Sequence, residues 1–259
     1  MKDYIAYLNF DDISQEELVE YLNKDIKEKK KVTVVTPNLD GLRVSYKDKE
    51  LREFINSSNY VTIDGKPVLW IAKWCKKKNF KYKISGSDLV PRVLEEANKF
   101  GYSITIFGGK EGVADKAKEN ILNQYKNIKT INTICPDFGF EKDQEKSQKY
   151  INQINDFNSD IVLLCTGFPK TELFFMNNKD QFSNSAYFFV GATVDFLAGN
   201  IKRAPKWMSN CGFEWLYRLS KDFKRLFKRY WLDFWFLVKM WFMCHFKKKK
   251  FQNIINDTK

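Results

Sequence analysis

The stretch Asn59–Gly65, Asn-Tyr-Val-Thr-Ile-Asp-Gly, delivers one carboxylate to the end of a short β-branched run. Residues 60–63 favour a strand, because β-branched and aromatic side chains suit a pleated, half-buried surface. Asp64 and Gly65 are poor strand residues and good turn residues, so the strand should stop there. The pattern therefore predicts Asp64 at the mouth of a loop.

Other apolar runs along the chain also stop at small or polar residues. They are 32–35, followed by Thr36-Pro37-Asn38; 104–107, followed by Gly108-Gly109; 161–165, followed by Thr166-Gly167; and 187–190, followed by Gly191-Ala192-Thr193. The ends of parallel strands meet on one rim, and ligands of open α/β sheets bind outside the carboxyl ends of the strands. We therefore expect the function on a rim where Asp64 is the only carboxylate, made of Thr36, Asn38, Asp64, Gly108, Gly167 and Gly191.

Strand and helix patterns alternate through the first 199 residues. Strands are predicted at 4–8, 31–35, 60–64, 103–107, 129–134, 160–165 and 187–190, and helices at 14–22, 51–57, 68–77, 89–100, 113–125, 144–157 and 170–182. Helix caps are expected at Ser14 and at Ser85 or Ser87, with a helix end at Gly101. The alternation predicts an α/β domain over residues 1–199, with a parallel sheet and right-handed crossovers.

The C-terminal part has a different character and is predicted as a helical appendage over 200–250, followed by a tail at 251–259. Residues 207–226 place apolar side chains at steps of four, as an amphipathic helix does. Residues 230–246 are rich in Trp and Phe and precede four lysines. This second segment is too short and too charged to span a membrane comfortably, but it suits the headgroup boundary. The alternative is an aromatic helix packed on the domain or on a second subunit.

The formal net charge is +12 and the pI about 9.3. Such an excess indicates an anionic partner, which is a nucleic acid, an anionic lipid or a phosphorylated substrate. Fourteen basic and three acidic residues lie between 200 and 250, so the appendage carries nearly the whole excess. Because these charges cluster beside a Trp-rich segment, we expect an anionic membrane surface as a partner and no nucleic acid.

The cysteines show no C-x-x-C pair, so we expect buried, reduced thiols in a cytosolic protein at Cys75, Cys135, Cys165, Cys211 and Cys244. His245 is the only histidine and lies near the far end of the chain. Its position excludes a Ser-His-Asp or Cys-His site, and a His-rich metal site, in the main domain. The first residues lack the apolar core of a signal peptide, so export is not expected.

Several motifs follow one another in an order typical of one family. They are Thr36-Pro37-Asn38, Thr62-Ile63-Asp64-Gly65, Ser85-Gly86-Ser87-Asp88-Leu89, Phe107-Gly108-Gly109, Gly-Phe-Pro-Lys-Thr-Glu at 167–172, Gly-Ala-Thr-Val-Asp-Phe-Leu-Ala-Gly at 191–199, Lys202-Arg203-Ala204-Pro205 and Glu-Trp-Leu-Tyr-Arg-Leu at 214–219. Over roughly residues 5–230 the chain resembles the WecG/TagA/CpsF family of bacterial glycosyltransferases. It departs from the family at Thr171, where Gln is usual, and at Asp222-Phe223, where Glu-Pro is usual.

The resemblance implies a Rossmann-like, mostly parallel sheet with helices on both faces, in an enzyme peripheral to the inner face of the bacterial cell membrane. It implies transfer of a sugar, commonly N-acetylmannosamine or its uronic acid, from a UDP donor to a sugar on an undecaprenyl diphosphate carrier. The product would serve cell-surface polysaccharide or teichoic acid synthesis. Asp64 would be the base, with Thr36 and Asn38 lining its pocket. Residues implied in substrate binding are Gly167, Pro169, Lys170, Glu172, Gly191, Asp195, Arg203, Arg218, Arg225 and Arg229.

The chemistry can also be argued without the family. Inverting glycosyl transfer needs one base for the acceptor hydroxyl, and positive charge or hydrogen-bond donors for the leaving diphosphate. Asp64 meets the first need. For the second, many such enzymes hold a metal with Asp-x-Asp, a motif that this chain lacks. Arginines and backbone amides must then substitute, so we expect no metal and no cofactor.

Alternative roles remain open for some of these residues. Asp195 is a second candidate base, although its Val-Asp-Phe-Leu setting also fits a structural or hydroxyl-binding residue. Asp64 has the alternative of a simple turn residue. The turn Gly108-Gly109 is either a phosphate or sugar site at a helix start, or only a tight turn. The arginines bind either the diphosphate or lipid headgroups, and both roles can coexist.

Two competing classes of function follow from the same residues. One is a nucleic-acid-binding α/β protein, suggested by the pI and the interleaved aromatic and basic residues. The other is a noncatalytic protein that binds a UDP-sugar. The sequence leaves open the donor and acceptor sugars, the polymer and the oligomeric state, a homo-oligomer included.

Overall fold

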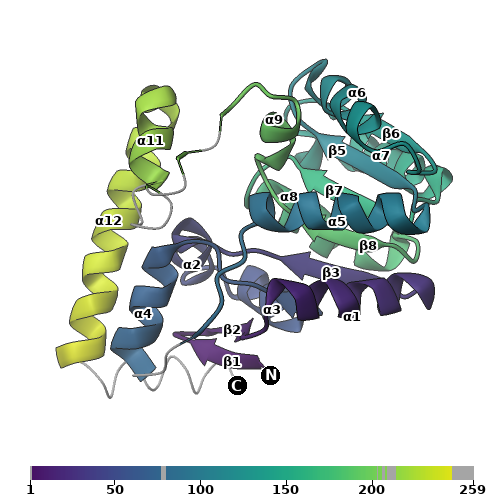
Figure 1. Cartoon of the computed structure of the whole chain (residues 1–259). Helices are drawn as coiled ribbons and strands as arrows, with labels where there is room; N and C mark the ends of the chain where they lie inside the picture. Colours follow the sequence, from purple (N-terminus) through teal and green to yellow (C-terminus); the bar gives the residue numbers. More distant parts are fainter. Residues whose placement is uncertain (1, 77–79, 203, 206–207, 209–213, 247–259) are drawn as a thin grey trace.

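The centre of the protein is a six-stranded sheet with the strand order β4-β3-β8-β7-β5-β6, in which every pairing is parallel (Figure 1). The computed structural model describes residues 2–76, 80–202, 204–205, 208 and 214–246. The strands are β3 Val32–Val35, β4 Tyr60–Val61, β5 Ile104–Gly108, β6 Ile131–Ile134, β7 Ile161–Cys165 and β8 Ala186–Phe189. The predicted α/β fold with a parallel sheet is confirmed.

Helices cover both faces of this sheet (Figure 1). The helices before the C-terminal segment are α1 Gln15–Lys27, α2 Leu39–Ser45, α3 Lys49–Ser57, α4 Lys66–Lys76, α5 Gly86–Phe100, α6 Val113–Gln124, α7 Gln144–Phe157, α8 Lys170–Asn177 and α9 Thr193–Leu197, with 3-10 turns η1 Phe140–Lys142 and η2 Lys179–Gln181. Alternate residues of one strand enter different cores. In β7, Val162 and Leu164 pack with α3, α7 and α8, whereas Ile161 and Leu163 pack with α1, α5 and α6. This alternation is the period-2 pattern of a strand buried on both faces.

The predicted helix starts are borne out by the capping contacts. Ser14 and Glu17 form a capping box, in which each side chain accepts a hydrogen bond from the other residue's backbone N–H. Ser85 rather than Ser87 caps α5, and Gly101 ends that helix in the left-handed region with φ 68°. Helix α2 was not predicted. The expected helix at 170–182 is shorter, since α8 ends at Asn177 and a 3-10 turn follows.

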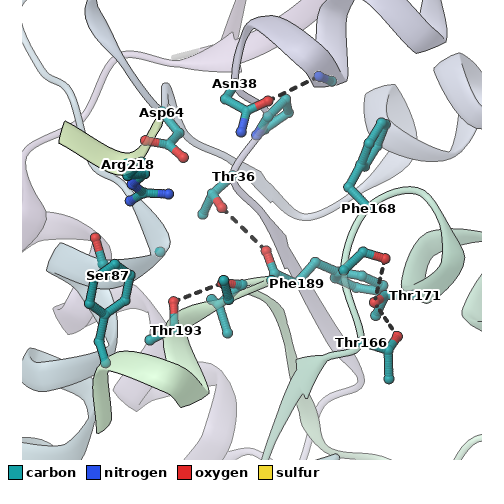
Figure 2. Close-up of a pocket in the computed structure, with 18 of the residues that line it drawn as sticks. Thr36, Asn38, Asp64, Ser87, Thr166, Phe168, Thr171, Phe189, Thr193 and Arg218 are labelled. Carbon is teal, nitrogen blue, oxygen red and sulfur yellow. Dashed lines mark hydrogen bonds between the residues drawn. The ribbon is translucent and has the colours of Figure 1, made fainter. Parts of the chain in front are cut away.

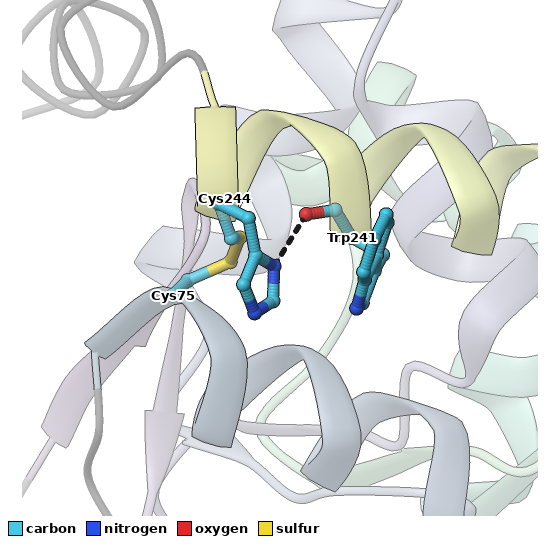
Figure 3. The surroundings of a disulfide bond; sticks show 4 residues. Cys75, Trp241 and Cys244 are labelled. Atoms are coloured by element: carbon cyan, nitrogen blue, oxygen red, sulfur yellow. Dashed lines mark hydrogen bonds between the residues drawn. A yellow bond between two sulfur atoms is a disulfide. The ribbon is translucent and has the colours of Figure 1, made fainter.

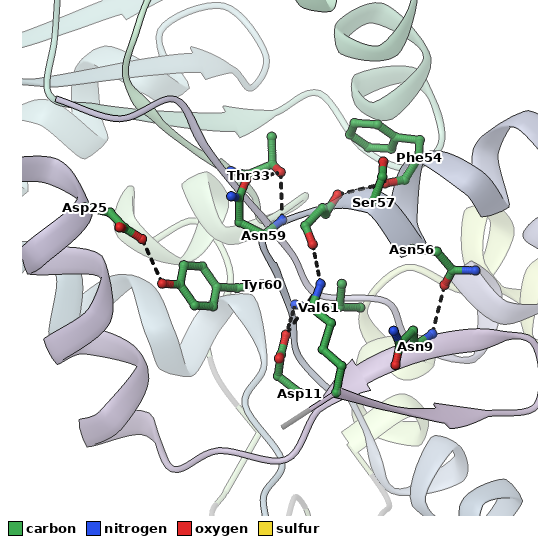
Figure 4. Close-up of polar contacts among 12 residues, drawn as sticks. Asn9, Asp11, Asp25, Thr33, Phe54, Asn56, Ser57, Asn59, Tyr60 and Val61 are labelled. Carbon is green, nitrogen blue, oxygen red and sulfur yellow. Dashed lines mark hydrogen bonds and ion pairs between the residues drawn. The ribbon is translucent and has the colours of Figure 1, made fainter. Parts of the chain in front are cut away.

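The N-terminal residues form an antiparallel hairpin, β1 Lys2–Ile5 and β2 Leu8–Asp11. The single strand expected at 4–8 is wrong, because Ala6 adopts φ 57° and reverses the chain in the middle of that segment. The hairpin is tied to the sheet by the Asp11 carboxylate, which accepts a hydrogen bond from the backbone N–H of Val61 at 2.9 Å (Figure 4).

Polar side chains hold the two-residue strand β4 in place (Figure 4). The Asn59 side-chain oxygen accepts hydrogen bonds from the backbone N–H of Thr33 at 3.0 Å and from its hydroxyl at 3.1 Å. The Tyr60 hydroxyl donates to Asp25 on α1 at 2.8 Å. These bonds compensate for the shortness of the strand, so the residues that follow it have a fixed starting point.

The C-terminal segment forms two helices, α11 Glu214–Lys221 and α12 Phe223–Phe246, with a break at Asp222. The single helix expected through residue 226 is therefore wrong at the break, while residues 206–207 and 209–213 lie outside the described residues. Helix α12 is 24 residues long and stands beside α2 and α4 (Figure 1). None of the helices in the described residues is both long and apolar enough to cross a membrane.

Helix α12 has a buried stripe and an aromatic outer surface. The buried residues recur at helical spacing and are Leu226, Asp233, Phe236, Met240, Met243 and Cys244. The exposed apolar residues of this helix, here called the aromatic face, are Phe223, Phe227, Trp231, Leu232, Phe234, Trp235, Val238, Trp241, Phe242 and Phe246. The helix thus packs on the domain and also presents a large apolar surface to its surroundings.

A disulfide joins Cys75 on α4 to Cys244 on α12 (Figure 3). The expectation of buried, reduced thiols is wrong for this pair, and Cys135 is exposed; only Cys165 is both free and buried among the described cysteines. Since 169 residues separate the bonded cysteines, the pairing follows from helix packing and not from a local motif.

The disulfide makes a prediction about thiol counts. When thiols are trapped by alkylation at cell lysis, denatured protein should take up two more labels after reduction, at Cys75 and Cys244. Cys244→Ser should lower the free energy of unfolding by about 2–4 kcal/mol, because the cross-link restricts the unfolded chain. Cys135→Ser, which removes an exposed thiol, is the matched control and should change little. Equal labelling before and after reduction would show that the two thiols are not bonded.

Candidate active site

A pocket of about 330 Å³ opens where the carboxyl ends of β3, β4, β7 and β8 meet (Figure 2). The predicted rim residues that line it are Thr36, Asn38, Asp64, Gly167 and Gly191. These strand ends therefore lie at one rim, whereas Gly108, which was also predicted there, does not line the pocket. The volume lies in the range of small-molecule sites.

Asp64 is placed by backbone hydrogen bonds that continue the pairing of β3 and β4 beyond both strands. The N–H of Thr62 donates to the carbonyl of Val35 at 3.0 Å, and the N–H of Asp64 donates to the carbonyl of Pro37 at 3.2 Å. The carboxylate is therefore held beside the loop that follows β3 (Figure 2).

Two polar residues of that loop face the same pocket. The Thr36 hydroxyl donates to the carbonyl of Phe189 at 3.2 Å, which ties the ends of β3 and β8 together. Asn38 caps α2, and its side-chain oxygen accepts a hydrogen bond from the N–H of Gly41 at 3.1 Å. Both side chains are thus fixed by the fold next to Asp64 (Figure 2).

The loop from β7 into α8 forms a second wall. It contains a cis peptide bond between Phe168 and Pro169, and Lys170 and Glu172 line the pocket in the first turn of the helix. The hydroxyl of Thr171, the residue that departs from the family, forms a 2.6 Å hydrogen bond with the hydroxyl of Thr166 and is buried (Figure 2). The Thr171 hydroxyl therefore bonds to Thr166, which lies at the other end of the same loop.

The loop after β8 completes the wall. Gly191 lines the pocket, and the Thr193 hydroxyl donates to the carbonyl of Val190 at 2.7 Å (Figure 2). Asp195, in α9, does not line the pocket. Its carbonyl accepts hydrogen bonds from the N–H groups of Asn200 and Ile201 at 3.0 and 3.3 Å, which fold the chain back after the helix.

The appendage supplies the remaining wall. Its pocket-lining residues are Ile201, Tyr217, Arg218, Lys221, Asp222, Leu226 and Arg229. Figure 2 shows Arg218 on the side of the pocket where Asp64 lies. The Arg218 guanidinium also lies over the ring of Phe196 at 5.3 Å, so an appendage cation packs directly on α9 of the α/β domain. Arg203 lies outside the described residues, and Arg225 belongs to α12.

The predicted turn Gly108-Gly109 is not part of the pocket wall. A Cβ atom on Gly108 would lie 2.5 Å from the backbone carbon of Cys165, and the residue has φ 126°. Glycine is therefore needed here for the close approach of β5 and β7. Pro169 also lies outside the pocket-lining residues, although its neighbours on both sides contribute.

The pocket combines cations with one unusual acid. The basic side chains are Lys170, Arg218, Lys221 and Arg229, and the acidic ones are Asp64, Glu172 and Asp222. Glu172 is only 7% exposed, and its Oε2 has no hydrogen-bond partner. Burial raises the pKa of Glu172 to about 7, since a charged carboxylate is poorly solvated there.

In the described residues, no three His, Cys, Asp or Glu side chains gather into a metal-binding cluster.

Sequence reasoning missed several pocket residues. They are Ser87, Thr166, Phe196, Tyr217, Lys221 and Leu226. Ser87, Phe196 and Tyr217 fall inside the quoted motifs, which could have pointed to them. Lys221 and Leu226 carry no signal of their own, because only the packing of α11 and α12 brings them to the pocket.

Comparisons with known proteins agree on one family. The family model described as "Glycosyl transferase WecG/TagA/CpsF family" matches residues 4–251. The chain is also 30% identical over 202 residues to the N-acetylglucosaminyldiphosphoundecaprenol N-acetyl-beta-D-mannosaminyltransferase of Bacillus subtilis strain 168. That match covers 78% of this chain and 76% of the relative.

Glu172 makes a prediction about the pH dependence of stability. Its carboxyl ionises near 4.5 in the unfolded chain and near 7 in the folded protein, so the folded state holds more protons between these values. Stability should therefore fall as the pH rises through this window, by on the order of 3 kcal/mol from this group. The free energy of unfolding of Glu172→Gln, measured with urea, should lack that fall. Relative to the wild type, this variant should therefore be more stable at pH 8 than at pH 5. The control is Glu119→Gln, which changes an exposed carboxyl. If Glu172→Gln and the wild type differ in unfolding free energy by the same amount at pH 5 and pH 8, the assignment is contradicted.

Proposed function

The chain belongs to the WecG/TagA/CpsF family of glycosyltransferases, and from this premise we propose a specific reaction. The protein transfers N-acetylmannosamine, or a related hexose, from a UDP-sugar to a sugar on undecaprenyl diphosphate, with inversion. The product is an intermediate of cell-surface polysaccharide or teichoic acid synthesis. The activity that the name of the Bacillus subtilis relative gives supports this choice of donor and acceptor.

The observation that carries the proposal is a carboxylate at the pocket rim, Asp64, together with several cations in the same pocket. Asp64 lies at its rim with Thr36 and Asn38, and Arg218 and Arg229 enter from the appendage. A carboxylate alone could serve as a general base in many reactions, and cations alone could bind any phosphate. Their combination suits the transfer of a sugar away from a diphosphate, which needs both.

In the proposed mechanism, Asp64 takes the proton from the acceptor hydroxyl. The hydroxyl oxygen then attacks the anomeric carbon of the donor and forms the new glycosidic bond. The bond between that carbon and the β-phosphate oxygen breaks, and UDP leaves with its electron pair. Cations of the pocket bind the developing charge through charge-assisted hydrogen bonds, which guanidinium groups such as that of Arg218 can form in a bidentate way.

The two loops of the second wall are proposed to hold the donor. Gly167, Lys170 and Glu172 come from the loop after β7 and the first turn of α8, and Gly191 comes from the loop after β8. A protonated Glu172 would donate a hydrogen bond to a sugar hydroxyl, consistent with its raised pKa and its unpartnered oxygen. Because the chain has no Asp-x-Asp pair, the cations of the pocket are proposed to replace a metal.

The aromatic face of α12 is proposed to rest on the cytoplasmic side of the cell membrane. Tryptophan and phenylalanine with nearby lysines favour the headgroup region, and each basic residue near anionic lipid contributes about 1 kcal/mol. A lipid-linked acceptor lies in that same plane. Since α12 also contributes Arg229 to the pocket, the surface that binds lipid and the wall that binds diphosphate belong to one helix.

The reaction can be tested by UDP release from a panel of UDP-sugars, with a short-chain GlcNAc diphosphate lipid as acceptor. Wild-type protein should release UDP with UDP-ManNAc, and EDTA should not slow it. Asp64→Asn should lower kcat by about 100-fold or more, because a positioned base contributes about that much. Asp195→Asn is the matched control and should retain most of the activity.

Each other outcome points to a different error. Full activity of Asp64→Asn would exclude Asp64 as the base, and loss in Asp195→Asn alone would move the base to α9. A requirement for a divalent ion would contradict metal independence. UDP-sugar binding without release from any donor and acceptor would favour a noncatalytic binding protein.

Membrane docking is tested by sedimentation with anionic phosphatidylglycerol vesicles. Changing Trp231, Phe234 and Trp235 to Ser should weaken binding at least about tenfold, because each large apolar side chain contributes about 1.5–3 kcal/mol on burial. Raising the salt concentration should weaken wild-type binding further. The control changes Tyr21, Phe100 and Phe157, exposed aromatic residues of the α/β domain, to Ser. Equal binding by both triple variants would contradict docking through α12.

A further inference from the structure

A chain of alternating charges links α2 to α12. The Nε of Arg43, on α2, donates to Oδ1 of Asp233, on α12, at 2.7 Å. Arg43 also donates to Oδ1 of Asp40, one turn earlier in α2. The other oxygen of Asp40, Oδ2, lies 3.9 Å from Nε of Arg229. The order of the chain is therefore Asp233, Arg43, Asp40, Arg229.

Both acids of this network are buried. Asp40 is 7% exposed and Asp233 is 6% exposed. Charged groups in such places are costly to desolvate, and their removal one at a time leaves an uncompensated partner. Burial raises the pKa of Asp233 to about 6, and the hydrogen bond from Arg43 opposes that effect. Each acid is thus tolerated because a guanidinium is held against it.

The network meets the candidate active site at one end only, through Arg229 of α12. Arg229 lines the pocket, whereas Asp40, Arg43 and Asp233 do not. Asp40 lies in the first turn of α2, the helix that Asn38 caps from within the pocket wall. Asp40 is therefore fixed to the loop beside Asp64, and it faces a cation that comes from the appendage.

The separation between Asp40 and Arg229 suggests how the network acts. At 3.9 Å the two form an ion pair, and the Nε of Arg229 has no hydrogen-bond partner. An arginine has a flexible side chain with many rotamers, so a buried acid beside it limits the positions of its guanidinium. The Asp233 to Arg43 bond holds α12 itself against α2, which sets where the Arg229 side chain begins.

We propose that Asp40, Arg43 and Asp233 are positioning residues that hold Arg229 in register with the loop that carries Thr36 and Asn38, so that a diphosphate meets Arg229 at a fixed place beside Asp64. The inference rests on the proposed function. The diphosphate is that of the donor nucleotide or that of the lipid-linked acceptor, and the kinetic constants for the two substrates distinguish them.

The test uses the full chain in the UDP-release assay, with KM measured separately for the UDP-sugar and for the diphosphate lipid. Asp40→Asn and Asp233→Asn keep the shape of each side chain and remove its charge. Each should lower kcat/KM by about tenfold or more, since misplacement by about 1 Å can cost 100-fold. A rise in KM for the lipid alone assigns Arg229 to the acceptor, and a rise for the UDP-sugar alone assigns it to the donor.

A double-mutant cycle separates positioning from mere stability. If Asp40 acts through Arg229, Asp40→Asn should have no further effect on kcat/KM in an Arg229→Met background. If Asp40 only stabilises the fold, its effect should be the same in both backgrounds, and the proposal is overturned. Glu95→Gln, which breaks the exposed ion pair with Arg92 on α5, is the control and should leave kcat/KM unchanged.

A variant that fails to fold, as thermal unfolding would reveal, is replaced by Arg43→Lys. This change keeps the positive charge but cannot make the forked contact with two acids, so it should still lower kcat/KM. Asp233→Glu should restore part of the activity lost in Asp233→Asn. If Asp40→Asn, Asp233→Asn and Arg43→Lys all keep the wild-type kcat/KM, the positioning role is overturned and the proposed function stands. Absence of transfer by the wild type would instead overturn the proposed function, and this inference with it.

Discussion

The pairing of β3 with β4 beyond the ends of both strands is the constraint on which the site depends. Strand β4 is only two residues long, yet the hydrogen bond from Asp64 N–H to the Pro37 carbonyl carries the parallel register into the loops. This bond brings a carboxylate from one loop beside Thr36 and Asn38 of the other. Such a site is rigid because its backbone continues the hydrogen bonding of the sheet. A rigid backbone holds the carboxylate in one position, as a group that must meet a substrate hydroxyl in one geometry requires.

The appendage completes a pocket that the α/β domain leaves open. One side of helix α12 packs on the domain, where Phe236 and Met240 are buried, and the other side presents the aromatic face. The same helix sends Arg229 into the pocket. In the proposed function, α12 needs both a surface for the membrane and a cation for the pocket, because a lipid-linked acceptor reaches the enzyme only at the membrane surface. Binding to that surface and binding of a diphosphate would then involve neighbouring turns of one helix, and the disulfide to Cys75 would hold its far end in place.

Sequence patterns predicted the sheet, most helix bounds and a rim that includes Asp64, because apolar runs that end in small or polar residues are local signals. They did not predict the hairpin at Ala6, since alanine is not a usual turn residue and its positive φ is imposed by the fold. The sequence left the turn Gly108-Gly109 open between a binding site and a tight turn, and it could not show that Gly108 is needed for the close approach to Cys165. The contacts of Asp40 and Arg43 with α12 lay beyond reach, because tertiary packing alone brings these distant segments together.

The central claim is that the pocket shared by the sheet and the appendage is where sugar transfer occurs. The most direct test is a crystal structure of the protein with UDP bound. The account predicts that the diphosphate lies in this pocket, with Arg218 or Arg229 within hydrogen-bond distance and with open space in front of Asp64 for the acceptor hydroxyl. UDP bound at the Gly108-Gly109 turn, or with Asp64 turned away from its diphosphate, would contradict the account.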